Sequence, residues 1–129
     1  MSKEHLKELI SSTMNQYIEL SHFIWENPEL RFQTDKAAER FAYMLDKEGF
    51  KVETNVAGVP NAIKATFGNK GPVIGLLAEY DALSNMNQIA DLGQKESEKE
   101  NQPGHGCGHN LLGVASLAAA VALKDYLIE

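Results

Sequence analysis

The spacing of apolar residues predicts two helices in the first half of the chain. Within residues 4–25, apolar side chains recur at steps of three and four, which places them on one face of a helix. Asn27-Pro28 follows, and the residue before a proline is biased away from helical geometry, so we expect the helix to end there. A second helix is predicted over residues 34–48, with Thr34 as its N-cap and Gly49 as its C-terminal cap.

The pattern then changes to one typical of strands. Residues 50–56 and 61–67 alternate apolar and polar positions, as half-buried strands do. Residues 73–78 form a continuous apolar run, which predicts a strand covered on both faces. Residues 111–128 form a third, alanine-rich helix that we expect to be buried. The predicted order is two helices, three strands, a loop and a helix, and the strand–loop–helix unit at its end is typical of the α/β class.

A long segment without periodicity separates the last predicted strand from the last helix. Residues 83–103 contain the charge run 95–100, which is typical of a solvated surface segment. Loops of this length in compact domains are usually functional or disordered. Because ligands of open α/β sheets bind outside the carboxyl ends of strands, we expect Asp81 and residues 104–110 to meet at one sheet edge.

Composition narrows the class of protein. A length of 129 residues has room for one domain, and a net charge of −6 leaves no basic stripe for nucleic acid. No window approaches the roughly 18 apolar residues that a membrane helix needs, and no signal peptide is recognised, so we expect no membrane partner. The single cysteine excludes an internal disulfide and favours a reducing, cytoplasmic setting.

The strongest chemical signal is the glycine-rich cluster of residues 104–110, with the sequence GHGCGHN, which we do not expect in the core. Cys107 and His109 are two residues apart, so in an extended segment both side chains point to one side and reach one ion. Thiolate and imidazole are ligands that suit zinc, and the positive end of the following helix favours a thiolate. The pattern predicts a metal site. A glycine-rich turn with a buried thiol, or a thiol nucleophile with a histidine base, stays open.

Two carboxylates follow the apolar run. Asp81 can accept a hydrogen bond from the free nitrogen of a metal-bound imidazole, which would fix the tautomer of that ring. The equal alternative is that Asp81 caps a turn. Glu79 is either a weak ligand or an edge charge, and His105 is near enough to line the site without being required as a ligand.

Four segments occur in an order that resembles a known family. They are NPEL at 27–30, GFKV at 49–52, LAEYDAL at 77–83 and GHGCGHNLLG at 104–113. Together they resemble the amidohydrolase branch of the zinc-dependent aminoacylase and carboxypeptidase family, in the form found in p-aminobenzoyl-glutamate hydrolases. The resemblance implies a mixed, mostly parallel sheet flanked by helices. It also implies two divalent ions, zinc or manganese, and hydrolysis of an amide bond in an acyl- or aroyl-amino acid or a dipeptide.

The resemblance assigns roles to individual residues. Cys107 and His109 match metal ligands, and Asp81 matches the aspartate that orients a ligand or tunes the metal. Glu79 stands where other branches of the family have a histidine ligand, which Cys107 would replace here. The family's glutamate pair, its further histidine ligands and its lid domain cannot be placed within 129 residues.

We therefore expect residues 1–129 to be the N-terminal part of a metallohydrolase catalytic domain that binds metal weakly and hydrolyses little alone. Whether the isolated chain is an enzyme stays open, as does a homo-oligomer. The alternatives are a small metal-binding module that works as it stands and an interaction protein that docks on a full-length partner.

Overall fold

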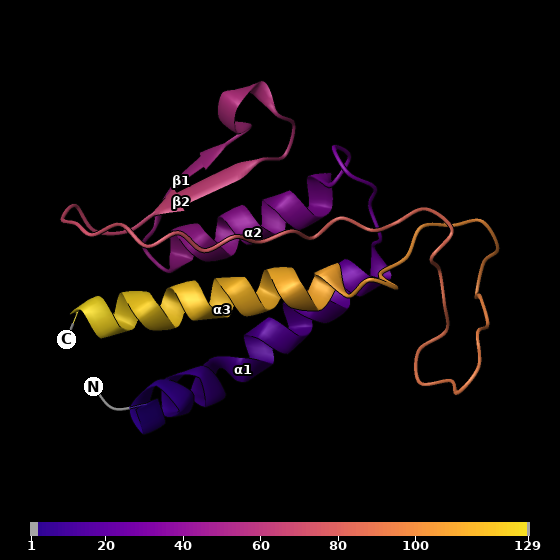
Figure 1. The fold of residues 1–129 in the computed structure, drawn as a ribbon, viewed down its shortest axis with the longest axis horizontal. Helices are drawn as coiled ribbons and strands as arrows, with labels where there is room; N and C mark the ends of the chain where they lie inside the picture. The colour runs from indigo at the N-terminus through magenta and orange to yellow at the C-terminus, as the bar shows by residue number, and fades with distance from the viewer. Residues whose placement is uncertain (1–2, 129) are drawn as a thin grey trace.

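The computed structural model describes residues 3–128, in which three α-helices lie side by side, a small antiparallel sheet packs on the outer side of the second helix, and long extended segments connect the elements (Figure 1). In chain order the elements are α1 (Lys3–Glu26), α2 (Asp35–Lys47), β1 (Lys51–Thr54), the short 3-10 helix η1 (Val56–Gly58), β2 (Ile63–Thr66) and α3 (His109–Ile128). The three predicted helices are confirmed to within two residues at each end.

The core lies between the three helices. α1 packs most extensively against α3, and α3 runs between α1 and α2 in Figure 1. Within α2 the predicted inner face is confirmed, because Ala37, Phe41 and Leu45 are buried. The stripe on α1 is only partly buried, since Met14 and Ile18 are each 44% exposed. The core cluster comprises Tyr17, Leu20, Ile24, Ala37, Phe41, Leu45, Val114, Leu117 and Val121.

Glu29, rather than Thr34, caps the N-terminus of α2. Thr34 occupies the N-cap position as predicted, but its side chain makes no capping hydrogen bond. The two carboxylate oxygens of Glu29 instead accept hydrogen bonds from the backbone N–H groups of Lys36 and Ala37, each at 3.0 Å. These are donors that the helix itself leaves unpaired. At the other end Gly49 takes the predicted left-handed conformation, with φ +81°.

Polar side chains fasten α3 to both neighbouring helices. Asn110 donates to the hydroxyl of Ser21 on α1 at 3.1 Å. Near the other end, the ammonium of Lys124 donates to the Glu48 carboxylate at 2.8 Å and to its backbone carbonyl at 3.0 Å. Burial alone would lower the pKa of Lys124, but its bonds to Glu48 and Asp125 outweigh burial and raise that pKa above its ordinary value.

β1 and β2 pair in antiparallel register, from Lys51 opposite Thr66 to Thr54 opposite Ile63. The two strands predicted over residues 50–56 and 61–67 are therefore present in shortened form. The expected mostly parallel mixed sheet is not confirmed, because the described residues contain this two-stranded antiparallel sheet.

The prediction of a buried strand over residues 73–78 is wrong for this structure. The segment is extended but unpaired within residues 3–128, and it runs across the molecule as an open trace in Figure 1. Val73 and Leu77 are 94% and 92% exposed. An apolar run becomes a covered strand only when other backbone pairs with its edges and other elements cover its faces. The described chain supplies neither.

Backbone hydrogen bonds fix the position of the residues that follow this segment. The backbone N–H of Ala82 donates to the carbonyl of Glu29 at 2.7 Å, within a parallel bridge between Leu30 and Ala82. Leu83 and Gly104 exchange two backbone hydrogen bonds of 3.0 Å, which brings the glycine-rich cluster beside Asp81. Gly113 lets the segment approach α3, since a Cβ there would lie 2.7 Å from the carbonyl oxygen of Glu79.

By length and composition alone, α3 could cross a membrane. This differs from the sequence expectation, which found no window of that kind. The same test is passed by the core helix of a folded domain, and the buried residues of α3, among them Val114, Leu117 and Val121, belong to the core cluster. The composition of α3 is therefore weak evidence for a membrane span.

Candidate metal centre

His109 and Asp81 form the most constrained pair in the predicted site. His109 is the first residue of α3, and its Nδ1 lies 2.9 Å from both the backbone carbonyl oxygen and the carboxylate Oδ1 of Asp81. A carbonyl oxygen can only accept, so Nδ1 carries the proton and donates. In the neutral ring Nε2 then has a free lone pair. The expected contact between Asp81 and an imidazole is thus present in the structure.

Glu79 faces the other nitrogen of the same ring. Its Oε1 lies 3.5 Å from His109 Nε2, and Glu79, Asp81 and His109 offer ligand atoms that are all within 4.8 Å of one another. The Glu79 side chain is 56% exposed, whereas that of His109 is 13% exposed. One imidazole nitrogen and a carboxylate therefore converge at a place that solvent reaches, which suits zinc or manganese.

Cys107 lies in the turn that precedes α3, and its free thiol is exposed. The assumption that residues 107–109 are extended is wrong, because Gly108 has φ +77° and its N–H donates to the His105 carbonyl at 2.8 Å. Residue spacing alone therefore does not place both side chains on one side. Cys107 is not a member of the Glu79–Asp81–His109 group. Its role as a metal ligand stays a prediction.

His105 is a buried residue of the glycine-rich cluster, contrary to the expectation that the cluster avoids the core. The residue is 4% exposed, and its Nε2 lies 3.1 Å from the carbonyl oxygen of Ile24, to which it donates. Burial lowers the pKa of His105 and so favours the neutral ring. The neighbouring Gly104 is equally constrained, since a Cβ there would collide with the backbone carbonyl of Met86. Both residues position the turn that carries Cys107.

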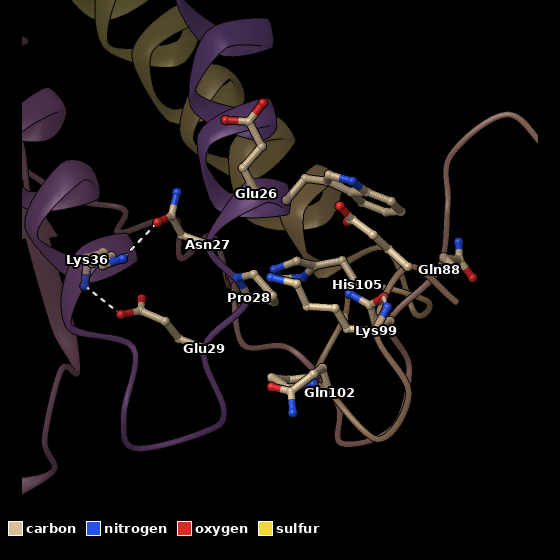
Figure 2. A pocket seen from close by; sticks show the side chains of 14 residues that line it. Glu26, Asn27, Pro28, Glu29, Lys36, Gln88, Lys99, Gln102 and His105 are labelled. Atoms are coloured by element: carbon tan, nitrogen blue, oxygen red, sulfur yellow. Dashed lines mark hydrogen bonds between the residues drawn. The ribbon is translucent and has the colours of Figure 1, made fainter. Parts of the chain in front are cut away.

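A cavity of about 550 Å³ lies beside His105, between the end of α1 and the long loop before α3 (Figure 2). At its edge the Lys36 ammonium donates to the side-chain oxygen of Asn27 at 2.8 Å, and Lys36 N–H donates to Glu29. The residues that line this cavity do not include Glu79, Asp81, Cys107 or His109. The cavity is therefore separate from the candidate metal centre.

Comparison with known proteins gives matches over nearly the whole chain, although no protein-family model matches. A subunit of the p-aminobenzoyl-glutamate hydrolase of Escherichia coli K12 is 44% identical over 122 residues, which cover 95% of this chain and 25% of that subunit. The hippurate hydrolase of Campylobacter jejuni is 35% identical over 118 residues, covering 90% of this chain and 30% of that protein. The amidohydrolase resemblance is confirmed.

The fold agrees with that family. A crystal structure described as an aminohydrolase from methicillin-resistant Staphylococcus aureus superposes with a TM-score of 0.76 and 28% identity. The match covers 96% of this chain and 31% of that one. The chain thus spans about a quarter to a third of the length of the amidohydrolases it matches. This partial coverage agrees with the expectation of one part of a catalytic domain.

Proposed function

We propose that this chain supplies part of the metal centre of an amidohydrolase that cleaves amide bonds in N-acyl- or N-aroyl-amino acids or small dipeptides. A substrate of the p-aminobenzoyl-glutamate kind is favoured by the 44% identity to the Escherichia coli hydrolase. In this proposal the isolated chain binds a divalent ion and turns over little substrate.

The observation that carries the proposal is the pair of bonds at His109 Nδ1. Because Asp81 accepts both, the ring is fixed with Nε2 directed towards Glu79. This is the arrangement in which a carboxylate orients an imidazole ligand and increases its basicity. In the proposal Nε2 of His109 and the thiolate of Cys107 hold the ion, and Glu79 is an additional oxygen ligand.

The donor set fits zinc and, less closely, manganese. Imidazole and thiolate suit zinc, whereas a set dominated by carboxylate oxygen suits manganese. A bound ion of either kind supplies Lewis acidity, which polarises an amide carbonyl and makes water a better nucleophile. This chain's own contribution is to hold His109 at the start of α3 and to keep its Nδ1 protonated through Asp81.

Metal binding by the purified chain tests the ligand assignment. Calorimetric titration with zinc chloride and with manganese chloride is expected to show one site that His109→Ala abolishes. Cys107→Ser is expected to weaken zinc binding more than manganese binding, because the thiolate is the softer ligand. His22→Ala, which removes an exposed histidine of α1, is the matched control. Unchanged zinc affinity in both His109→Ala and Cys107→Ser would contradict the assignment.

Activity is tested separately from binding. The purified chain, loaded with zinc or manganese, is incubated with p-aminobenzoyl-glutamate and release of p-aminobenzoate is measured. We expect little turnover, far below about 1 per second. Turnover of about 1 per second or faster, within the ordinary range of enzymes, would show that the chain is a complete catalyst.

The position of Glu79 favours one alternative, a small metal-binding module that needs no further ligands. In that case Glu79 completes the site within the chain, so zinc binding would be tight and stoichiometric, and Glu79→Gln would weaken it as strongly as Cys107→Ser. In the amidohydrolase proposal, Glu79→Gln has the smaller effect, because its side chain is more than half exposed.

A further inference from the structure

The turn that carries Cys107 needs a glycine at position 106 for steric reasons. The N–H of Gly108 donates to the carbonyl of His105 at 2.8 Å, so Gly106 and Cys107 are the two central residues of a β-turn. Gly108 has a positive φ, but Gly106 does not. A left-handed backbone therefore does not require glycine at position 106, and its surroundings must explain it.

Met86 occupies the space beside Gly106. A Cβ added to Gly106 would lie 2.6 Å from the Cε methyl of Met86, well inside ordinary van der Waals contact. The same methionine constrains Gly104, since a Cβ there would collide with the Met86 carbonyl. Met86 thus packs against the glycine-rich cluster on both sides of the buried His105, with its main chain on one side and its side chain on the other.

The backbone of Met86 is held in place from both directions along the chain. Three residues before it, Leu83 exchanges two hydrogen bonds of 3.0 Å with Gly104. Directly after it, the N–H of Asn87 donates to the carbonyl of Gln102 at 3.2 Å. These bonds join the two ends of the long loop before α3, which is visible as the large excursion in Figure 1.

Asn87 also ties Met86 to the interior of that loop. The Asn87 carbonyl accepts a hydrogen bond from the Ser97 hydroxyl at 3.1 Å, and its side-chain oxygen accepts one from the N–H of Lys99 at 3.0 Å. The residue next to Met86 therefore makes three cross-links within the loop. The loop, which the sequence left without a role, supports the methionine that packs on Gly106.

Cys107 itself contributes little to fixing the turn. Its thiol is exposed, and no hydrogen bond to the thiol is found among residues 3–128. The centre of the turn is held by the bond from Gly108 to His105 and by the contact of Met86 with Gly106. A ligand whose backbone is fixed beforehand loses less conformational entropy when it binds an ion.

We propose that Met86 is a positioning residue of the candidate metal centre. Its side chain holds the turn so that the backbone of Cys107 stays in a fixed place beside His109, and the thiolate then reaches the ion at a smaller entropic cost. Met86 does not bind the ion and acts through Gly106. This inference rests on the proposed function, because it takes the Cys107 thiolate to be a ligand.

Metal titration of a truncated Met86 is the first test. Met86→Ala is expected to weaken zinc binding about tenfold, the lower end of the range for residues that support a ligand. Manganese affinity is expected to change less, because thiolate matters less to that ion. Met86→Leu, which keeps a bulky aliphatic side chain, is expected to retain most of the zinc affinity. Met14→Ala on α1 is the control, since it truncates another exposed methionine.

A swap of the methyl group between the two positions tests the contact itself. Gly106→Ala is expected to weaken zinc binding, because the Met86 methyl must move. In the double variant with Met86→Ala, the new Cβ at position 106 lies 3.5 Å from the Cβ of residue 86, an ordinary contact distance. The double variant is therefore expected to recover most of the zinc affinity that each single variant loses, which is the non-additivity expected of residues in contact.

Cobalt(II) in place of zinc reports directly on Cys107. A thiolate bound to cobalt gives a ligand-to-metal charge-transfer band in the near ultraviolet, and Cys107 is the only cysteine of the chain. At saturating cobalt, Met86→Ala is expected to weaken or shift this band, and the double variant to restore it. A general loss of stability would leave the band of the folded, metal-bound chain unchanged, so urea unfolding of each variant is measured alongside.

The inference fails if Met86→Ala binds zinc as tightly as the original chain, or if its cobalt band is unchanged. It also fails if the losses of Met86→Ala and Gly106→Ala add in the double variant, because the two residues then do not share one space. In these cases the ligand assignment of the proposed function still stands. If the original chain shows no charge-transfer band and Cys107→Ser leaves zinc affinity unchanged, Cys107 is not a ligand, and both this inference and that assignment are overturned.

Discussion

Removal of the Asp81 carboxylate should weaken metal binding by a moderate and calculable amount. His109 Nδ1 has two acceptors at 2.9 Å, the carboxylate and the backbone carbonyl of the same residue. In Asp81→Ala only the carboxylate is lost. The carbonyl still accepts the Nδ1 proton, so the tautomer that leaves Nε2 free is preserved.

The expected loss follows from that geometry. Removing a carboxylate that supports a metal-bound histidine typically costs about 10- to 100-fold in metal affinity. Because one of the two acceptors survives, we expect the lower end, about tenfold or about 1.4 kcal/mol. Asp81→Asn is expected to lose less, since an amide oxygen can still accept the bond.

Zinc titration calorimetry at one fixed pH measures this change. Asp46→Ala is the control, because it removes an exposed carboxylate on α2. An Asp81→Ala affinity within twofold of the original, in a chain where His109→Ala abolishes binding, would refute the orienting role of Asp81. Complete loss of binding in Asp81→Ala would instead show that the carboxylate is itself an essential ligand.

Three further predictions concern the elements that position the site. Glu29→Ala removes the cap of α2 and should lower the free energy of unfolding by about 1 kcal/mol in urea titrations, whereas Thr34→Ala should change it less because its side chain makes no capping bond. Burial and, secondarily, the nearby Glu29 raise the pKa of Tyr80 to about 12. The unfolded chain therefore loses the phenolic proton at lower pH than the folded chain, and the free energy of unfolding should fall between about pH 10 and 12. Tyr80→Phe should remove this pH dependence, and an absorbance titration at 295 nm in which every tyrosine ionises near pH 10 would contradict the prediction. Gly113→Ala should lower the free energy of unfolding despite the better helix propensity of alanine, because the new Cβ would meet the backbone carbonyl of Glu79, which would have to move. The control is Gly75→Ala, where nothing lies within 4 Å of the added Cβ. A Gly113→Ala variant that unfolds at higher urea concentration than the original chain would contradict the prediction.

The helices and the two short strands could be predicted because their signals are local. The apolar spacing of α1 and α2 and the left-handed Gly49 depend on residues within a few positions. The cap supplied by Glu29 was missed, since its carboxylate reaches seven and eight residues ahead and Thr34 carries the usual signature.

The extended segment of residues 73–78 shows the limit of what a sequence pattern can predict. A continuous apolar run indicates that a segment can be buried as a strand, but the partners that bury it are not encoded in the run itself. Within residues 3–128 those partners are missing, and the same residues are exposed. The sequence therefore predicted the character of the segment correctly and its environment incorrectly.

At the candidate metal centre, the contact between Asp81 and His109 could be predicted, because Asp81 follows an apolar run and the end of that run was expected to lie beside the start of the last helix. The orientation of the Cys107 side chain could not be predicted from the sequence. The positive φ of Gly108 breaks the two-residue alternation on which the prediction depended. The sequence did not decide whether Glu79 is a weak ligand or an edge charge, because its position relative to His109 Nε2 depends on the course of the backbone after Leu77.

Glu79 and Asp81 follow directly on the exposed residues 73–78, and this shared backbone has a thermodynamic consequence. Whatever immobilises residues 73–78 also reduces the motion of both carboxylates, and an ion held by the carboxylates would stiffen these residues in return. Cation affinity and local backbone order are then linked, and each must strengthen the other by an identical factor. A divalent cation would therefore slow backbone hydrogen exchange in residues 73–78 as well as occupy the candidate metal centre.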